Sequence, residues 1–342
     1  MSSKQLLQKI YSLTPMQEGI LYHTLREENQ GNFIVQLFFS VEGSLSLDIM
    51  NKSMQLLVQR HDVFRTLFNV DKAKRPIQMV VDHLEHKIVF QDLTEKNHDC
   101  QMEYISHYAD QEKMKGFDVT AEMLVRLAVF QTNLQHFRLL LSFHHIIVDG
   151  WSLSAIVQEL FEIYSALSAQ RSPVLREIHS FQNYIEWLNR QDQDSASLYW
   201  NQYLEGIEQS TALPWQPKQK KEGYLQEQVK FTFDREMTKK IKELALAYRV
   251  TMNAVIQAIW SIVLKRYNDT NDVVFGTVVS GRHAAVSGID QMIGIFINTN
   301  PVRINFEQDI DFEDLLILIH KQMIDSQEHS HYPLMKIQAL RH

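Results

Sequence analysis

Two adjacent histidines and an Asp-Gly pair in the segment SFHHIIVDGWS, residues 142–152, are the residues whose types could do chemistry. An imidazole exchanges a proton near neutral pH, as general acid–base catalysis requires. Because side chains alternate along a strand, an extended segment sends His144 and His145 to opposite faces, one toward the core and one toward a cleft. Asp149 follows an apolar run, so we expect it to be partly buried and to need a cationic partner. Gly150 is expected to allow a positive φ or a close backbone approach at the turn.

Other chemistries fit this segment less well. Adjacent strand residues cannot easily share one metal ion, and no nearby Cys, His or Glu supplies further ligands, so we expect no metal site. Two incidental histidines, one in the core and one exposed, remain the purely structural alternative. The sequence lacks a G-x-S-x-G elbow, and its 11 glycines form no phosphate-binding or dinucleotide-binding pattern.

The composition limits the class of protein. The chain has 342 residues, 45% hydrophobic and 22% charged, with a net charge of -7, which argues against a nucleic-acid-binding surface. A single cysteine, Cys100 in a polar stretch, excludes an internal disulfide framework and fits a reducing compartment. The N-terminus does not resemble a secretory signal, and no apolar window reaches membrane-spanning length. We therefore expect a cytoplasmic protein with neither nucleic-acid nor membrane partners.

The elements that must position the histidines alternate between strands and helices. Strands are expected at residues 33–43, 64–70, 76–81, 125–132, 137–148, 229–237, 272–282 and 291–306. Helices are expected at residues 13–28, 45–61, 101–115, 153–170, 237–249, 251–268 and 312–330, with further helical stretches within 181–206. This alternation in both halves predicts two α/β subdomains with mixed sheets, residues 1–175 and residues 176–342.

The motif HHIIVDG has the form HHxxxDG, and other segments accompany it in order along the chain. These are LTPMQEGILYH, RHDVFRTLF, FQNYIEWL, DVVFGTVVSGR, IGIFINTNPVR and HYPLMKIQAL. With them, the sequence resembles the condensation domains of non-ribosomal peptide synthetases, in the wider chloramphenicol acetyltransferase-like superfamily. The resemblance implies two α/β subdomains with mixed sheets, arranged as a V around a central tunnel. The C-terminal one is expected to be truncated, because family domains generally run on beyond residue 342.

The resemblance also implies an activity and roles for individual residues. The amino group of an acceptor aminoacyl thioester would attack a donor peptidyl or aminoacyl thioester, each on the 4′-phosphopantetheine arm of a peptidyl carrier protein. The domain itself would bind no cofactor, and an adenylation domain would lie adjacent. His145 matches the catalytic position, either as a base or as a group that orients the amine. His144, Asp149 and Gly150 match architectural positions. Arg282 is the expected partner of Asp149, and Asn298 is expected near the tunnel.

The subtype and the alternatives follow from the same segments. LTPMQEGILYH and HHIIVDGWS resemble condensation domains that accept a D-configured donor, and the S-x-A-Q-x-R opening typical of the L-donor subtype is absent. An epimerisation-type or other acyltransferase of the superfamily is an alternative activity. A catalytically idle module that docks carrier proteins, or an incomplete fragment, is the alternative that is not an enzyme.

Overall fold

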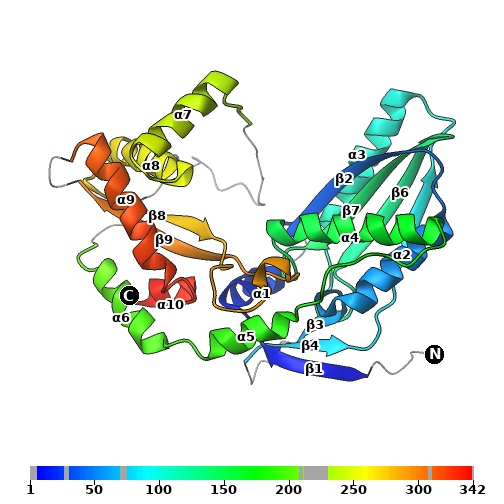
Figure 1. Ribbon diagram of the computed structural model, residues 1–342, viewed down its shortest axis with the longest axis horizontal. Helices are drawn as coiled ribbons and strands as arrows, with labels where there is room; N and C mark the ends of the chain where they lie inside the picture. The colour runs from blue at the N-terminus through cyan, green and yellow to red at the C-terminus, as the bar shows by residue number, and fades with distance from the viewer. Residues whose placement is uncertain are drawn as a thin grey trace. The chain divides into compact units, whose positions relative to one another are not determined.

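The computed structural model describes residues 6–26, 31–69, 75–207, 211, 230–306 and 310–340. The chain divides into two compact units: unit 1 contains Met1–Gln191 and Ala284–Ile297, and unit 2 contains Asp192–His283 and Asn298–His342. Figure 1 shows the elements of both units along the chain. The division near residue 175 stays a prediction about subdomains. The compact units themselves divide after Gln191, and the segment 284–297 packs with unit 1.

The larger sheet of unit 1 is mixed and has the strand order β2-β7-β6-β5. Its strands are β2 (Ile34–Glu42), β5 (Ile88–Asp92), β6 (Val125–Asn133) and β7 (His136–His144). The central strand β7 is antiparallel to both of its neighbours, whereas β5 and β6 are parallel. In the β2–β7 register Ile34 lies opposite His144, so the first histidine of the motif ends a fully paired central strand.

The smaller sheet of unit 1 has the strand order β1-β4-β3. It consists of β1 (Leu7–Ser12), β3 (Thr66–Asn69) and β4 (Ile77–Val81), and a 3₁₀ turn, η1 (Asp62–Arg65), leads into β3. The strands expected at residues 64–70 and 76–81 are confirmed as β3 and β4, and they form an antiparallel pair. The connection at residues 70–74 lies outside the described residues. The sequence analysis missed β1, whose apolar residues Leu7 and Ile10 are each 53% exposed.

Helices cover both faces of the larger sheet. On one face α2 (Leu47–Arg60) and α4 (Gly150–Ser168) share a core with the alternate β7 residues Leu139, Leu141 and Phe143. On the other face α3 (His98–Lys115) packs over Leu140 and its neighbours in β6. This period-two division is the one that strand geometry requires of a sheet buried on both sides.

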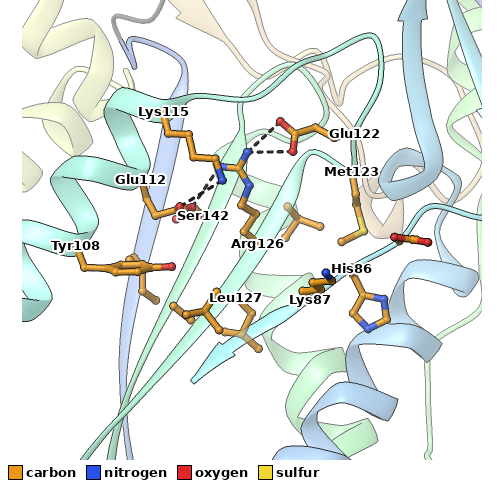
Figure 2. A pocket seen from close by; sticks show the side chains of 15 residues that line it. His86, Lys87, Tyr108, Glu112, Lys115, Glu122, Met123, Arg126, Leu127 and Ser142 are labelled. Atoms are coloured by element: carbon orange, nitrogen blue, oxygen red, sulfur yellow. Dashed lines mark hydrogen bonds and ion pairs between the residues drawn. The ribbon is translucent and has the colours of Figure 1, made fainter. Parts of the chain in front are cut away.

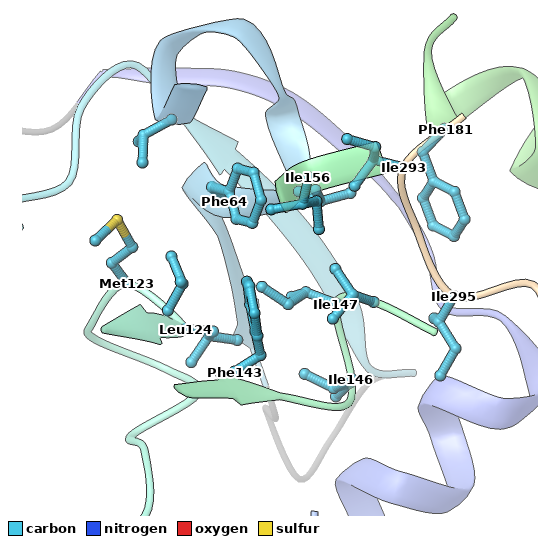
Figure 3. Close-up of a cluster of buried hydrophobic side chains, with 14 of the residues drawn as sticks. Phe64, Met123, Leu124, Phe143, Ile146, Ile147, Ile156, Phe181, Ile293 and Ile295 are labelled. Atoms are coloured by element: carbon cyan, nitrogen blue, oxygen red, sulfur yellow. The ribbon is translucent and has the colours of Figure 1, made fainter. Parts of the chain in front are cut away.

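The strand that carries the histidines ends at His144 and not at residue 148, as the sequence had suggested. Residues 145–147 form a turn, in which the N–H of Ile147 donates to the carbonyl of His144 at 3.3 Å. The apolar residues of the turn do not extend the ladder, because Ile146 and Ile147 are buried in the core of unit 1. Figure 3 shows Ile146 and Ile147 beside Phe143 and near Ile293 and Ile295 of the segment 284–297. The helix α5 (Phe181–Asn189) belongs to the same core through Phe181.

Unit 2 is built on one antiparallel strand pair, β8 (Asp272–Val279) with β9 (Asn298–Asn305). Its helices are α6 (Gln193–Tyr203), α7 (Arg235–Ala247), α8 (Met252–Asn268), α9 (Phe312–Gln327) and α10 (Leu334–Ala339). Apolar residues of α7, α8 and α9 form one core with β8 and β9. A smaller cluster joins α6 to α10 around the fully buried Trp200.

Two strand predictions near unit 2 were wrong. Residues 230–234 are not a strand; they lead into α7, whose first turn is capped by Asp234 accepting a hydrogen bond from the N–H of Met237 at 2.7 Å. Residues 291–297 are also not a strand. They leave the 3₁₀ turn η2 (Ile289–Gln291) and pack in unit 1, and β9 begins only at Asn298.

Within the described residues, no single helix has the length and apolar character needed to span a membrane. Among the described helices, the pair α7 and α8, which is bent by 102°, is long and apolar enough when both are taken together, by length and composition alone.

Candidate functional site

The turn after β7 is held by the start of α1 (Pro15–Arg26). The N–H of Thr14 donates to Oε1 of Gln17 at 2.9 Å, and the N–H of Gln17 donates to Oγ1 of Thr14 at 3.2 Å. This reciprocal pair is a capping box. The side-chain nitrogen Nε2 of Gln17 donates to the carbonyl of Ile146 at 3.1 Å. Gln17 is only 2% exposed. Gln17 therefore fixes the backbone directly after the two histidines. The sequence analysis missed it, although Thr-x-x-Gln is the signature of a capping box.

Both ring nitrogens of His144 are engaged inside unit 1. Nδ1 accepts a hydrogen bond from the N–H of Ile146 at 3.2 Å, so Nε2 carries the proton and donates to Oγ1 of Thr24 at 3.3 Å. The side chain is 2% exposed, and the rings of Phe33 and Phe117 lie with their centroids 6.3 Å away. Burial, and then the proximity of His145, lower the pKa of His144 to about 4. His144 is therefore a neutral part of the architecture at physiological pH.

His145 is the first residue of the turn, and the structure holds it differently. Its backbone N–H donates to the carbonyl of Phe33 at 2.7 Å, which ties the residue to the start of β2. Its Nδ1 is buried and has no hydrogen-bond partner among the described residues. Buried polar atoms are nearly always paired, so an orphaned imidazole nitrogen needs an explanation, and a catalytic role is one. Of the two histidines, only His145 has a ring nitrogen that lacks a hydrogen-bond partner among the described residues.

Asp149 is the N-cap of α4 and is only 1% exposed. One carboxylate oxygen accepts hydrogen bonds from the N–H and the hydroxyl of Ser152, both at 2.9 Å. The other accepts from the N–H of Phe296 at 3.1 Å, and the N–H of Asp149 itself donates to the carbonyl of Gly294 at 3.1 Å. The hydroxyl oxygen of Ser152 also lies 2.8 Å from that carbonyl, so its single proton is shared between the carboxylate and the carbonyl. The carboxylate thus joins the start of α4 to the segment 284–297. Its buried negative charge is stabilised by these backbone N–H and hydroxyl donors.

The expectation for Gly150 was wrong. Its φ is not positive, and a Cβ added there would meet nothing within 4 Å. It begins α4 beside an open cavity of about 420 Å³. The glycine that a close approach requires is Gly294, where an added Cβ would lie 2.3 Å from the ring of Phe181. The sequence analysis overlooked this, because it took the Gly-containing segment 291–297 as part of a strand.

A second cavity, of about 340 Å³, lies on the α3 side of the sheet. Figure 2 shows Arg126 between Glu112 and Glu122, to which it is bonded at 3.2 and 2.9 Å. The guanidinium of Arg126 also stacks over the ring of Phe117, 4.0 Å from its centroid, and Phe117 in turn contacts His144 edge-on. Arg126 is thus held by two carboxylates, and its effect is to support the aromatic packing behind His144.

Arg282 and Asn298 both belong to unit 2. Arg282 is 8% exposed, and its pairing with Asp149 stays a prediction. Asn298 is 7% exposed, and its amide nitrogen donates to the carbonyls of Ser330 and Tyr332 at 2.7 and 3.1 Å. The side chain of Asn298 therefore anchors the loop after α9, and its expected place near a tunnel stays a prediction.

Within the described part of the chain, no group of three or more His, Cys, Asp or Glu side chains is arranged to hold a metal ion. Cys100 is an exposed free thiol near the start of α3, far along the chain from the motif.

Comparison with known proteins assigns this architecture. The family model for the condensation domain matches residues 7–341. Surfactin synthase subunit 3 of Bacillus subtilis (strain 168) is 38% identical over 337 residues, which are 98% of this chain and 26% of that protein. Gramicidin S synthase 2 of Brevibacillus brevis is 37% identical over 340 residues, which are 98% of this chain and 8% of that protein. The chain thus spans about a quarter of the length of the first relative and less than a tenth of the second.

Solved structures agree on the fold. The first condensation domain of the calcium-dependent antibiotic synthetase, in complex with a substrate analogue, superposes with a TM-score of 0.80 at 17% identity, covering 97% of this chain and 78% of that one. A four-domain nonribosomal peptide synthetase bound to AMP and glycine also gives 0.80, at 16% identity, covering 99% of this chain and 26% of that one. The fold is thus the mixed-sheet α/β fold of condensation domains, as the sequence had suggested. The chain belongs to the condensation-domain family.

Proposed function

We propose that this domain joins two thioester-bound substrates through an amide bond. The donor is a peptidyl or aminoacyl thioester on one carrier protein, and the acceptor is an aminoacyl thioester on another, each attached through 4′-phosphopantetheine. An adenylation domain adjacent in the same assembly would supply the activated acceptor, and the cytoplasm would be the working compartment. The matched family and the relatives among antibiotic synthases support this proposal.

The observation that carries the proposal is the contrast between the two histidines. Both nitrogens of His144 are occupied and its pKa is depressed to about 4, whereas Nδ1 of His145 is buried without a partner among the described residues. A reacting amine is an N–H donor that would meet such a nitrogen. We therefore assign the chemistry to His145 and the architecture to His144.

The reaction requires the protein to position the two substrates and to assist the transfer of one proton. The neutral acceptor amine forms a C–N bond to the donor carbonyl carbon, the C–S bond breaks, and the thiolate leaves with the proton that the nitrogen loses. An α-amino group has a reference pKa of about 7.7–8.0, so a fraction of it is already neutral at physiological pH. His145 would remove the proton or orient the amine. Positioned proton transfer typically contributes about 10²–10⁴-fold to a rate.

The groups around His145 would hold it in place. The carbonyl of Phe33 fixes its backbone, Gln17 fixes the next carbonyl, and Asp149 ties the following helix to the segment 284–297. Such support is what an active-site residue needs, because loss of orientation alone can cost much of a rate enhancement. The ion pair of Asp149 with Arg282, and the tunnel between the two subdomains with Asn298 near it, remain part of the proposal.

Single-turnover peptide formation between two loaded carrier proteins tests the proposal. We expect a new peptidyl thioester on the acceptor carrier, detected by intact-protein mass spectrometry, only when both carriers are loaded and the domain is present. Donors ending in D- and L-residues would test the subtype, with faster transfer expected from the D-configured donor. A domain that binds both carriers without forming product would refute the enzymatic proposal and leave the idle docking module.

A further inference from the structure

Gln78 is a polar residue at an inward-facing position of β4, in the smaller sheet of unit 1. Residues two apart on a strand share a face, and Val80, on the same face as Gln78, is fully buried. Gln78 itself is only 1% exposed. Burying an amide costs free energy unless its donors and acceptors are hydrogen-bonded. The burial of Gln78 is therefore tolerated because of the hydrogen bonds that it makes.

Gln78 forms a reciprocal amide pair with Gln17. Nε2 of Gln78 donates to Oε1 of Gln17 at 2.9 Å, and Nε2 of Gln17 donates to Oε1 of Gln78 at 3.2 Å. Nε2 of Gln78 also donates to the carbonyl of Ser12, the last residue of β1, at 2.8 Å. This carbonyl fixes which way the Gln78 amide is turned, since only the nitrogen end can donate to it. The oriented amide of Gln78 then fixes that of Gln17.

With this pair, all the hydrogen-bonding capacity of the Gln17 side chain is used. Its Oε1 accepts from the N–H of Thr14 as well as from Gln78, both at 2.9 Å. Its Nε2 donates to the carbonyl of Ile146 as well as to Gln78, at 3.1 and 3.2 Å. An amide oxygen has two lone pairs and an amide nitrogen has two protons, so every position is filled. Such a network is rigid, because a rotation of Gln17 would break several buried hydrogen bonds at once.

Two backbone tethers flank the side chain of His145. On one side its own N–H donates to the carbonyl of Phe33 at 2.7 Å. On the other side the carbonyl of the following residue, Ile146, is held by Gln17. Only φ and ψ angles of His145 and Ile146 lie between these two points, so the direction of the His145 side chain depends on both tethers. A displacement of that side chain would lower the rate, because catalysis depends on orientation.

We propose that Gln78 is a positioning residue for His145, acting through Gln17 and the carbonyl of Ile146. The inference rests on the function proposed above, in which His145 performs the chemistry. Without Gln78, one proton and one lone pair of the Gln17 amide lose their partners. The amide then gains freedom to turn away from Ile146, and the turn that carries His145 is held less firmly. The smaller sheet of unit 1 thus supports the turn that follows β7.

Gln78→Met tests the proposal, with Gln101→Met as the matched control. Both replace a buried glutamine of unit 1 by an unbranched apolar side chain. Gln101 is 6% exposed, and its Nε2 donates to the carbonyls of Leu93 and Thr132, so these bonds involve no residue of the motif. We expect both variants to lower the melting temperature. Only Gln78→Met should lower the single-turnover rate at saturating loaded carriers, by at least about fivefold, the ratio for one ordinary hydrogen bond, with unchanged affinity for the carriers.

The carbonyl of Ile146 can also be observed without any substrate, because Ile146–Ile147 is the only Ile-Ile step in the sequence. With isoleucine labelled by ¹³C at the carbonyl and ¹⁵N at the amide, a carbonyl–nitrogen correlation spectrum contains one cross-peak, which belongs to this step. We expect the cross-peak to shift in Gln78→Met and to stay in place in Gln101→Met. If Gln78→Met does not fold, Gln78→Asn, whose amide is one methylene shorter, replaces it.

An unmoved cross-peak in the folded Gln78 variant, or a wild-type rate of peptide formation by it, would overturn the proposal. An equal loss of rate in Gln101→Met would also overturn it, because the effect would then follow stability alone. If the wild-type domain forms no peptide, the proposed function fails, and the cross-peak decides by itself whether Gln78 holds the turn.

Discussion

Asp149→Ala should destabilise unit 1 through two separable losses. The first is the cap of α4, the hydrogen bond from the N–H of Ser152, which is worth about 0.5–2 kcal/mol. The second is the acceptor of the Phe296 N–H, a buried donor whose loss of a partner costs about 1–3 kcal/mol. Together these predict that the free energy of unfolding, measured by urea denaturation with circular dichroism, falls by about 1.5–5 kcal/mol.

Two further variants isolate the second loss. Asp149→Ser restores a cap to α4 but has a side chain too short to reach Phe296, so it should recover only the capping part. Asn97→Ala removes an exposed cap of α3 in the same unit, where the side chain accepts from the N–H of Cys100 at 2.9 Å, and should cost about 0.5–2 kcal/mol. If Asp149→Ala were no more destabilising than Asn97→Ala, the link from α4 to segment 284–297 would contribute nothing and our reasoning would fail.

Three further predictions concern the surroundings of the motif. The pKa of His144 is lowered from 6.5 to about 4, so between these pH values the unfolded chain binds a proton that the folded chain does not. The free energy of unfolding should therefore fall by up to about 3 kcal/mol as the pH is lowered from 6.5 to 4. His144→Asn should flatten this part of the plot of unfolding free energy against pH. Gln17→Met should lower the free energy of unfolding by about 1–3 kcal/mol in urea, unlike Gln55→Met on the exposed face of α2. A double-mutant cycle of Asp149→Ala with Arg282→Ala should give a coupling of about 0.5–3 kcal/mol if the two side chains pair, and a value near zero would remove that pair.

The sequence revealed most of the fold, because patterns of period two and 3.6 are strong where one face of an element is buried. The strand β7 and the helices α2 and α4 follow such patterns. Local sequence patterns gave wrong predictions where they differ from the tertiary packing. Residues 145–148 look like a strand but form a turn, because their apolar side chains enter the core of unit 1. The exposed strand β1 carries no alternation at all.

The candidate site could be predicted only in part from the sequence. The motif identified His144, His145 and Asp149, but alternation along an extended strand was the wrong reason to separate the histidines, since His145 already belongs to the turn. What distinguishes them is their hydrogen bonding, which depends on Thr24 and on the backbone of Ile146. Asp149 also accepts a hydrogen bond from the N–H of Phe296, which lies 147 positions later, and no local sequence pattern indicates that contact.

The central claim is that His145 performs the chemistry while its neighbours hold it in place. The most direct test is the single-turnover rate of peptide formation by His145→Ala, with His136→Ala at the exposed start of β7 as the matched histidine control. We expect the His145 variant to keep its melting temperature and its affinity for both loaded carriers and to lose about 10²–10⁴-fold in rate, with the control unchanged. A folded His145→Ala domain that forms peptide at the wild-type rate would contradict the account.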